Sequence, residues 1–84
     1  MAQLSPSSPA LNRLRAAAGL IPLIEDGLTH SRIDNSKAES MVAFCQWATN
    51  HDITGSQEAD RLTSNVITGI ERLQEYLNGK IPLS

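Results

Sequence analysis

Residues 54–79 read TGSQEADRLTSNVITGIERLQEYLNG, and this stretch decides the fold. Aliphatic residues recur in it at steps of four, four, three and four, which is the spacing of one stripe along a helix. They are Leu62, Val66, Ile70, Leu73 and Leu77. Asn78-Gly79 marks the end of the helix, because glycine readily takes the left-handed conformation that closes a helix. The stretch therefore predicts one long amphipathic helix against which the rest of the chain packs.

We expect this helix to begin with a capping box at Thr54. The Thr54 side chain can accept a hydrogen bond from the backbone amide of Gln57, and the Gln57 side chain can reach back to the cap residue. Gly69 lies inside the aliphatic stripe, where glycine costs about 1 kcal/mol relative to alanine. This position predicts a close crossing with another helix.

Another helix is predicted from Pro9 to about Leu28, with Ser8 as its cap and proline at the first helical position. Gly19 and Pro22 interrupt it, so the sequence allows either one kinked helix or two helices split near these residues. The apolar stripe continues across the interruption, which favours the kink. The stripe contains Leu11, Leu14, Ala18, Ile21 and Leu28, with Ala10, Ala17 and Ile24 beside it.

The helix between these two is predicted over about Lys37 to Asn50. Ser36 and Glu39 have the spacing of a capping box at its start. Cys45 lies in the middle of its apolar face, where a buried structural thiol is expected. The residues of this face are Ala38, Met41, Val42, Phe44, Cys45 and Ala48.

Together these patterns predict an all-α fold, a small antiparallel bundle of three helices whose first helix is kinked or split near Gly19 and Pro22. No stretch alternates apolar and polar residues for long enough to predict a strand. We expect residues 9–79 to form a single helical domain, with a flexible N-terminal tail over 1–8 and a C-terminal tail over 80–84. The small residues at 16–19 are expected to let another helix approach closely.

Composition narrows the class of protein further. The chain has 84 residues, a formal net charge of −2 and a pI near 5.5, so a basic surface for nucleic acid or anionic membrane is not expected. Cys45 is the only cysteine, which fits a reducing, intracellular setting. No secretory signal pattern and no membrane-length apolar run are present. These features predict a cytoplasmic protein.

The sequence contains no convincing catalytic or metal-binding motif. Residues 50–55 resemble the start of a calcium loop, but Arg61 stands where calcium needs a closing bidentate glutamate. His30 and His51 lie in predicted loops and have no partner at ligand spacing on a helix, so solvated side chains are expected. We predict that the protein is not an enzyme, that it uses no cofactor, and that it has no catalytic or metal site.

The remaining signal is apolar surface beyond what one central core requires. Leu20, Leu23, Trp47 and Ile67 lie at or beyond the edge of the apolar stripe on their helices, and they are the candidate interface residues. Two readings stay open: a tightly wrapped bundle hides all four, or some of them contact a partner. The interface reading predicts a small protein-protein interaction module that acts as a regulator, inhibitor or adaptor, and that forms a homodimer.

An alternative function is a nucleic-acid-associated regulator. It would use the basic residues of the N-terminal half, which are Arg13, Arg15, Arg32 and Lys37. A helix-turn-helix reading of the last two helices is weak, because the helix that would read DNA carries Glu58, Asp60, Glu71 and Glu75, and phosphates repel carboxylates. The protein-binding reading is therefore preferred.

Overall fold

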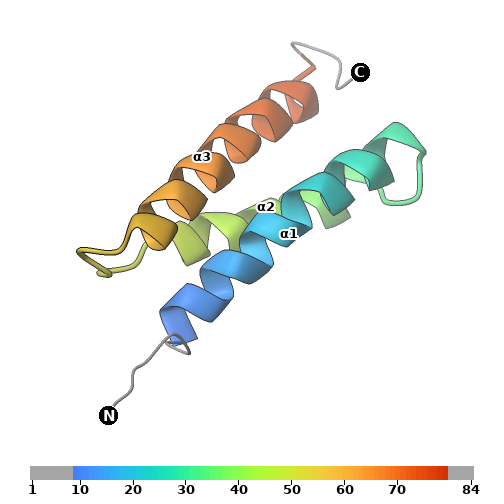
Figure 1. Cartoon of the computed structure of the whole chain (residues 1–84). Helices are drawn as coiled ribbons and strands as arrows, with labels where there is room; N and C mark the ends of the chain where they lie inside the picture. Colours follow the sequence, from blue (N-terminus) through green and yellow to red (C-terminus); the bar gives the residue numbers. More distant parts are fainter. Residues whose placement is uncertain (1–8, 80–84) are drawn as a thin grey trace.

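Three helices make up the computed structural model, which describes residues 9–79: α1 spans Pro9–Thr29, α2 spans Asn35–Thr49 and α3 spans Gln57–Leu77. Consecutive helices run in opposite directions, so α1 and α3 are parallel and α2 is antiparallel to both (Figure 1). Each helix packs against the other two. The all-α, three-helix prediction is confirmed. The tails expected over 1–8 and 80–84, and the cap expected at Ser8, lie outside the described residues.

α1 is one unbroken helix that contains Pro22, so the alternative of a helix split near Gly19 is wrong. Proline inside a helix costs about 3 kcal/mol, because it lacks an amide and crowds the preceding turn. Ile21 and Ile24, on either side of the proline, are both buried. Their burial, at about 1.5–3 kcal/mol for each side chain, offsets the cost of Pro22.

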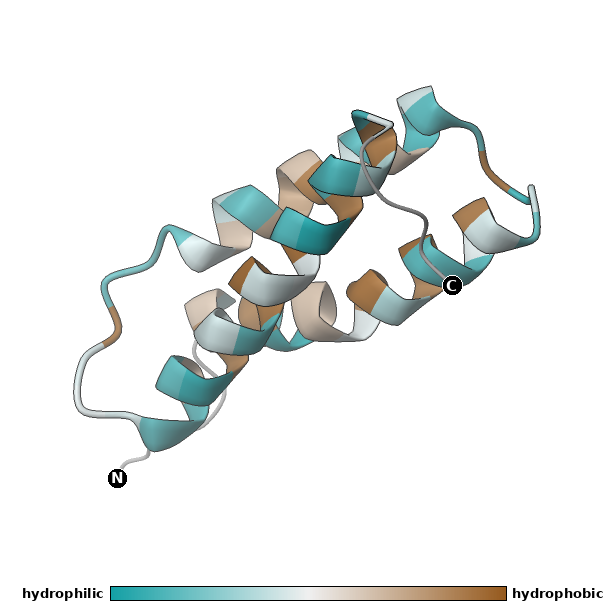
Figure 2. Cartoon of the chain, turned by 90° about the horizontal axis from the view of Figure 1, so that it is seen from above, coloured by the Kyte–Doolittle hydropathy of each residue, from teal (hydrophilic) through white to brown (hydrophobic). Residues whose placement is uncertain are grey.

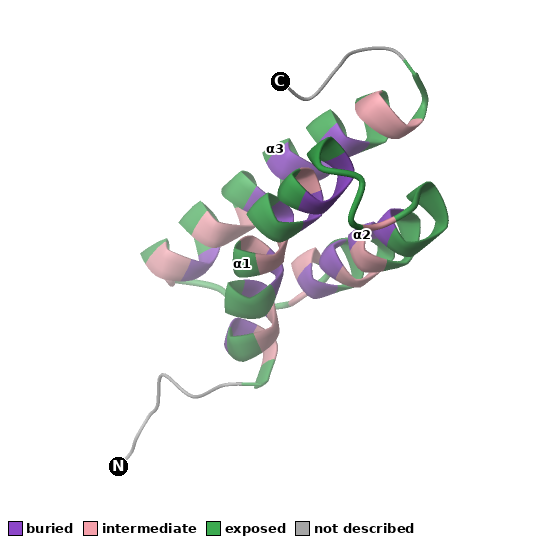
Figure 3. Cartoon of the chain, turned by 90° about the vertical axis from the view of Figure 1, so that its right-hand side faces the viewer, coloured by how far each residue is buried: buried purple, intermediate pink, exposed green. Residues whose placement is uncertain are grey.

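The core lies where the apolar stripes of the three helices meet. Figure 3 shows the buried residues along the inward sides of α1, α2 and α3, and Figure 2 shows apolar residues along the same helices. The largest fully buried side chains are Leu14, Ile24, Cys45, Val66 and Leu73. Packing of this kind accounts for helix formation better than local propensity does.

Cys45 is fully buried, as its position in the sequence predicts. Its thiol lies 3.8 Å from the carbonyl oxygen of Ala17 on α1 and donates a weak hydrogen bond to it. Burial raises the pKa of the Cys45 thiol, because the charged thiolate is disfavoured away from water. The residue therefore acts as a core side chain that joins α2 to α1.

Both predicted capping boxes are wrong, because each observed N-cap lies two residues away from the predicted one. The cap of α2 is Asp34, whose Oδ1 accepts from the Lys37 amide at 2.7 Å, and not Ser36. Aspartate caps as well as serine does, so the earlier residue begins the helix when the preceding turn places it correctly.

At the start of α3 the cap is Ser56, not Thr54, and its Oγ accepts from the Ala59 amide at 3.1 Å. Gly55 explains the shift, because its φ of +74° turns the chain just before Ser56 and keeps helical geometry from beginning earlier. Glu58 and Asp60 lie in the first turn, where carboxylates complement the helix dipole.

Gly69 of α3 packs directly against Ile21 of α1, which confirms the predicted close crossing. A Cβ atom built on Gly69 would lie 2.6 Å from Cγ2 of Ile21, closer than carbon atoms can pack. Of the small residues at 16–19, Gly19 takes no part in a close approach, because it is exposed and a Cβ there would meet nothing within 4 Å. Ala17 is the buried small residue of that segment.

We predict that Gly69→Ala and Gly69→Leu each lower the free energy of unfolding, by about 1–3 kcal/mol, because the added atoms overpack the contact with Ile21. Chemical denaturation measures the effect. Gly19→Ala is the matched control and should stabilise by up to about 1 kcal/mol, since alanine is the better helix former and the site is open.

Ile21→Leu removes the branched Cγ2 methyl at constant volume, so it should recover part of the loss when combined with Gly69→Ala. A Gly69→Ala variant as stable as the wild type would contradict the close crossing.

α1 ends in a Schellman motif whose left-handed residue is serine. The Arg32 amide donates to the Gly27 carbonyl at 2.7 Å, and the Ser31 amide donates to the Leu28 carbonyl at 3.3 Å. Ser31 has a φ of +58°. Ile33 then packs over Gly27, where a Cβ would lie 2.9 Å from Ile33 Cγ1. The sequence identifies this segment only as a loop, because serine does not signal a left-handed cap.

We predict that Ser31→Gly stabilises the protein by about 0.5–1 kcal/mol, because glycine takes the left-handed conformation without the steric cost of a Cβ atom. Thermal or denaturant unfolding checks the prediction. Ser40→Gly, an exposed position inside α2, is the matched control and should destabilise. Destabilisation by Ser31→Gly would show that the Ser31 conformation carries no strain.

Candidate functional site

An arginine stacked on an exposed tryptophan joins α1 to α2. The Arg13 guanidinium carbon lies 4.4 Å from the centroid of the Trp47 ring, in cation–π geometry. The Phe44 ring also packs against Trp47. The two ring centroids are 5.8 Å apart and the ring planes are tilted by 54°. Trp47 is nevertheless 54% exposed. The stack therefore forms part of the outer surface.

Leu20 and Leu23 extend this surface along α1. Leu20 follows Arg13 by seven residues, which brings it to within about 20° of the same direction around the helix axis. Because Arg13 faces α2, Leu20 also lies on the α2 side of α1. Leu23 is about 60° further outward. We refer to Arg13, Leu20, Leu23, Phe44 and Trp47 as the α1–α2 face.

Burial differs among the four candidate interface residues. Leu23 is 63% exposed and Trp47 54% exposed, whereas Leu20 is partly buried and packs against the core. Leu20 therefore belongs to the base of the α1–α2 face, and Leu23 and Trp47 form its outer part. Leu23 and Trp47 are therefore the exposed large apolar residues of this face, and their role in an interface stays a prediction.

Ile67 lies on a different side of the molecule. It is 43% exposed, and it borders an open hollow between α3 and the end of α2. The hollow is lined otherwise by Thr49, His51, Asp60, Thr63, Ser64 and Thr68. These neighbours are polar, so Ile67 is an isolated apolar residue, of the kind that is normal on protein surfaces. The structure does not bring it together with Trp47.

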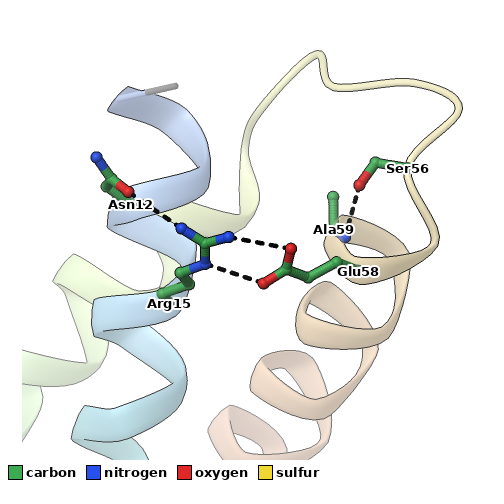
Figure 4. A network of polar contacts seen from close by, with 5 residues as sticks. All are labelled: Asn12, Arg15, Ser56, Glu58 and Ala59. Carbon is green, nitrogen blue, oxygen red and sulfur yellow. Dashed lines mark hydrogen bonds and ion pairs between the residues drawn. The ribbon is translucent and has the colours of Figure 1, made fainter. Parts of the chain in front are cut away.

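Ion pairs fasten α1 to α3 on the side away from the α1–α2 face. The Arg15 guanidinium forms a two-pronged contact with Glu58, with Nε–Oε2 at 2.9 Å and Nη2–Oε1 at 3.0 Å (Figure 4). These hydrogen bonds lower the pKa of the Glu58 carboxyl and raise the pKa of Arg15. Towards the other end of the two helices, Arg72 lies 3.2 Å from Glu25. The pairs fix the parallel register of α1 and α3.

The basic residues of the nucleic-acid alternative do not form one cluster. Arg15 is paired with Glu58, and Arg32, near the end of α1, is paired with Asp26. Arg13 and Lys37 lie at opposite ends of the α1–α2 pair, separated along α2 by about 15 Å. Carboxylates therefore neutralise two of these cations, and the alternative function stays a prediction.

His51 is a structural residue that the sequence does not reveal. Its Nδ1 accepts from the Ile53 amide at 3.1 Å, and Nε2 lies 2.7 Å from the Thr63 hydroxyl. Because Nδ1 accepts, Nε2 carries the proton and donates to Thr63. Thr63 in turn donates to the carbonyl of Ala59 at 2.7 Å. The expectation that His51 is simply solvated is wrong: the imidazole ties the α2–α3 connection to the first turns of α3.

We predict that His51→Ala destabilises the protein by about 1–2 kcal/mol, because it removes two hydrogen bonds and leaves the Ile53 amide without its acceptor. His30→Ala is the matched control: His30 is exposed and its contact with Asp26 lies at the surface, so its loss should change stability by less than about 0.5 kcal/mol. Equal effects of the two substitutions would contradict the structural role of His51. Nitrogen NMR of the imidazole should find the proton on Nε2.

The rest of the described surface offers no site with evident chemistry. A second open hollow lies between α2 and α3 and is lined by both polar and apolar residues. They are Glu39, Val42, Gln46, Gln74, Leu77 and Asn78. Within residues 9–79, no three histidine, cysteine, aspartate or glutamate side chains are grouped so as to hold a metal ion. None of the three described helices combines the length and the apolar character that crossing a bilayer requires.

The α1–α2 face is defined by its own geometry. Comparison with known proteins finds no matching family model, no similar curated protein and no similar solved structure.

Proposed function

We propose that the protein is a small helical binding module that acts by contacting another protein through the α1–α2 face. The observation that carries the proposal is the half-exposed Trp47 ring with Arg13 stacked on it. Tryptophan and arginine are the residue types that most often dominate the energy of protein interfaces. A regulator, inhibitor or adaptor works by such contacts.

The surroundings of Trp47 support the same function. Leu23 is exposed one turn beyond Leu20 on α1, and the partly buried Leu20 and Phe44 pack against the core. A partner that covers Leu23 and Trp47 gains about 25 cal/mol for each Å² of apolar area removed from water, before the costs of association. The bundle positions these side chains on two packed helices, so little ordering is required when a partner binds.

Affinity capture from cells that produce the protein tests this function. The wild type and an Ile67→Ser control should retain at least one protein that the double variant Leu23→Ser, Trp47→Ser loses. The retained protein, once purified, should bind the wild type directly in calorimetry. If the double variant captures the same proteins as the wild type, the α1–α2 face is not the binding surface and the proposal fails.

Self-association is the second part of the sequence-based prediction, and it is measured separately. Sedimentation equilibrium over a range of concentrations should reveal a dimer mass if two copies pair. A monomer mass at every concentration would contradict the homodimer and leave a different protein as the partner.

A further inference from the structure

We propose that the partner contacts the α1–α2 face with an amphipathic helix that carries a carboxylate, and that Arg13 receives this carboxylate. The inference rests on the proposed function and specifies the chemistry of the partner. It follows from the state of Arg13, from the composition of the face and from the direction in which the face runs.

Arg13 differs from the other arginines that face a neighbouring helix or turn. Arg15, Arg32 and Arg72 each lie against a carboxylate, whereas Arg13 lies on the ring of Trp47. Among residues 9–79, Arg13 Nε is buried and makes no hydrogen bond. Because Nε is buried, a partner can reach only the two terminal Nη groups, whose in-plane N–H donors match the two oxygens of a carboxylate.

The α1–α2 face cannot supply that carboxylate itself. Its five residues comprise one arginine and four apolar side chains. A second copy that packs the same face against it would therefore leave Arg13 without an anion. Charge complementarity favours a different protein, with an acidic group at the Arg13 end of its contact surface.

The direction of the face favours a helical partner. Leu23 follows Arg13 by ten residues on α1, so the face extends about 15 Å along the helix axis. Helices α1 and α2 satisfy their own backbone hydrogen bonds, so no strand edge is available to an extended chain. An amphipathic helix can instead pack against such a surface with apolar residues at i, i+4 and i+7. A glutamate at i+11 lies about 16 Å from the first of them on the same side of the partner helix, which matches the separation of Arg13 from Leu23.

Titration of the 84-residue chain with three designed peptides tests the inference. Each peptide is an alanine-rich helix without tryptophan and has leucine at i, i+4 and i+7; position i+11 is glutamate, glutamine or lysine. Trp47 is the only tryptophan of the chain, so its fluorescence reports binding at the face itself. We expect the glutamate peptide to bind about tenfold more tightly than the glutamine peptide, and the lysine peptide to bind most weakly.

Protein variants identify the receiving group. Arg13→Gln should abolish the preference for glutamate over glutamine, with circular dichroism used to verify that the helices are retained. Arg15→Gln is the matched control and should keep the preference, because Arg15 faces Glu58 on α3. Loss of the preference in both variants would assign it to the overall charge of α1 and overturn the role of Arg13.

Three further outcomes overturn the inference. The first is equal binding of the glutamate and glutamine peptides, and the second is no binding of any peptide. The third is a change in Trp47 emission that depends only on protein concentration and that no peptide reverses. The last outcome would mean that a second copy covers the face. The capture experiment stays independent: a partner lost only from the Leu23, Trp47 double variant supports the proposed function even if the peptides are not discriminated.

Discussion

Ile21 lies directly against the backbone of Gly69, and this contact sets how closely α1 and α3 approach. The two helices are not neighbours in sequence, so contacts between them, and not a short connection, hold them parallel. Ion pairs lie on either side of the crossing, Arg15 with Glu58 and Glu25 with Arg72. The exposed pair Arg15–Glu58 adds little stability, and the geometric effect of the two pairs is to fix the register of helices that Ile21 and Gly69 have already brought together.

The position of α2 follows from this arrangement. Val42 and Cys45 of α2 are buried in the core shared with α1 and α3, and the Cys45 thiol reaches the backbone of α1. The turn at either end is held by its own contacts, Ile33 over Gly27 before α2 and His51 with Thr63 after it. With α2 fixed between its neighbours, Trp47 falls beside Arg13 on the outer surface.

The proposed binding function would depend on a rigid surface. The α1–α2 face is carried by two packed helices, and its partly buried residues, Leu20 and Phe44, belong to the core as much as to the surface. A partner of the proposed kind would therefore meet a surface whose helices and base the fold has already positioned, which would lower the entropy that binding must overcome. The stack of Arg13 on Trp47 adds a charged group of fixed direction to an otherwise apolar surface.

The sequence alone determined the number, order and approximate limits of the helices, because their apolar stripes repeat with the period of a helix and Pro9 and Gly79 mark outer ends. It also identified the close crossing at Gly69 and the burial of Cys45. The sequence did not predict the caps at Asp34 and Ser56. Several residues that can cap a helix lie within three positions of each helix start, and the adjoining turns select among them. It likewise listed Leu20, Leu23, Trp47 and Ile67 together, as residues at the margins of their stripes. Only the tertiary structure separated Ile67 from the others and placed Arg13 on Trp47, because helical periodicity gives a side chain's direction around its own helix and not which helix it meets.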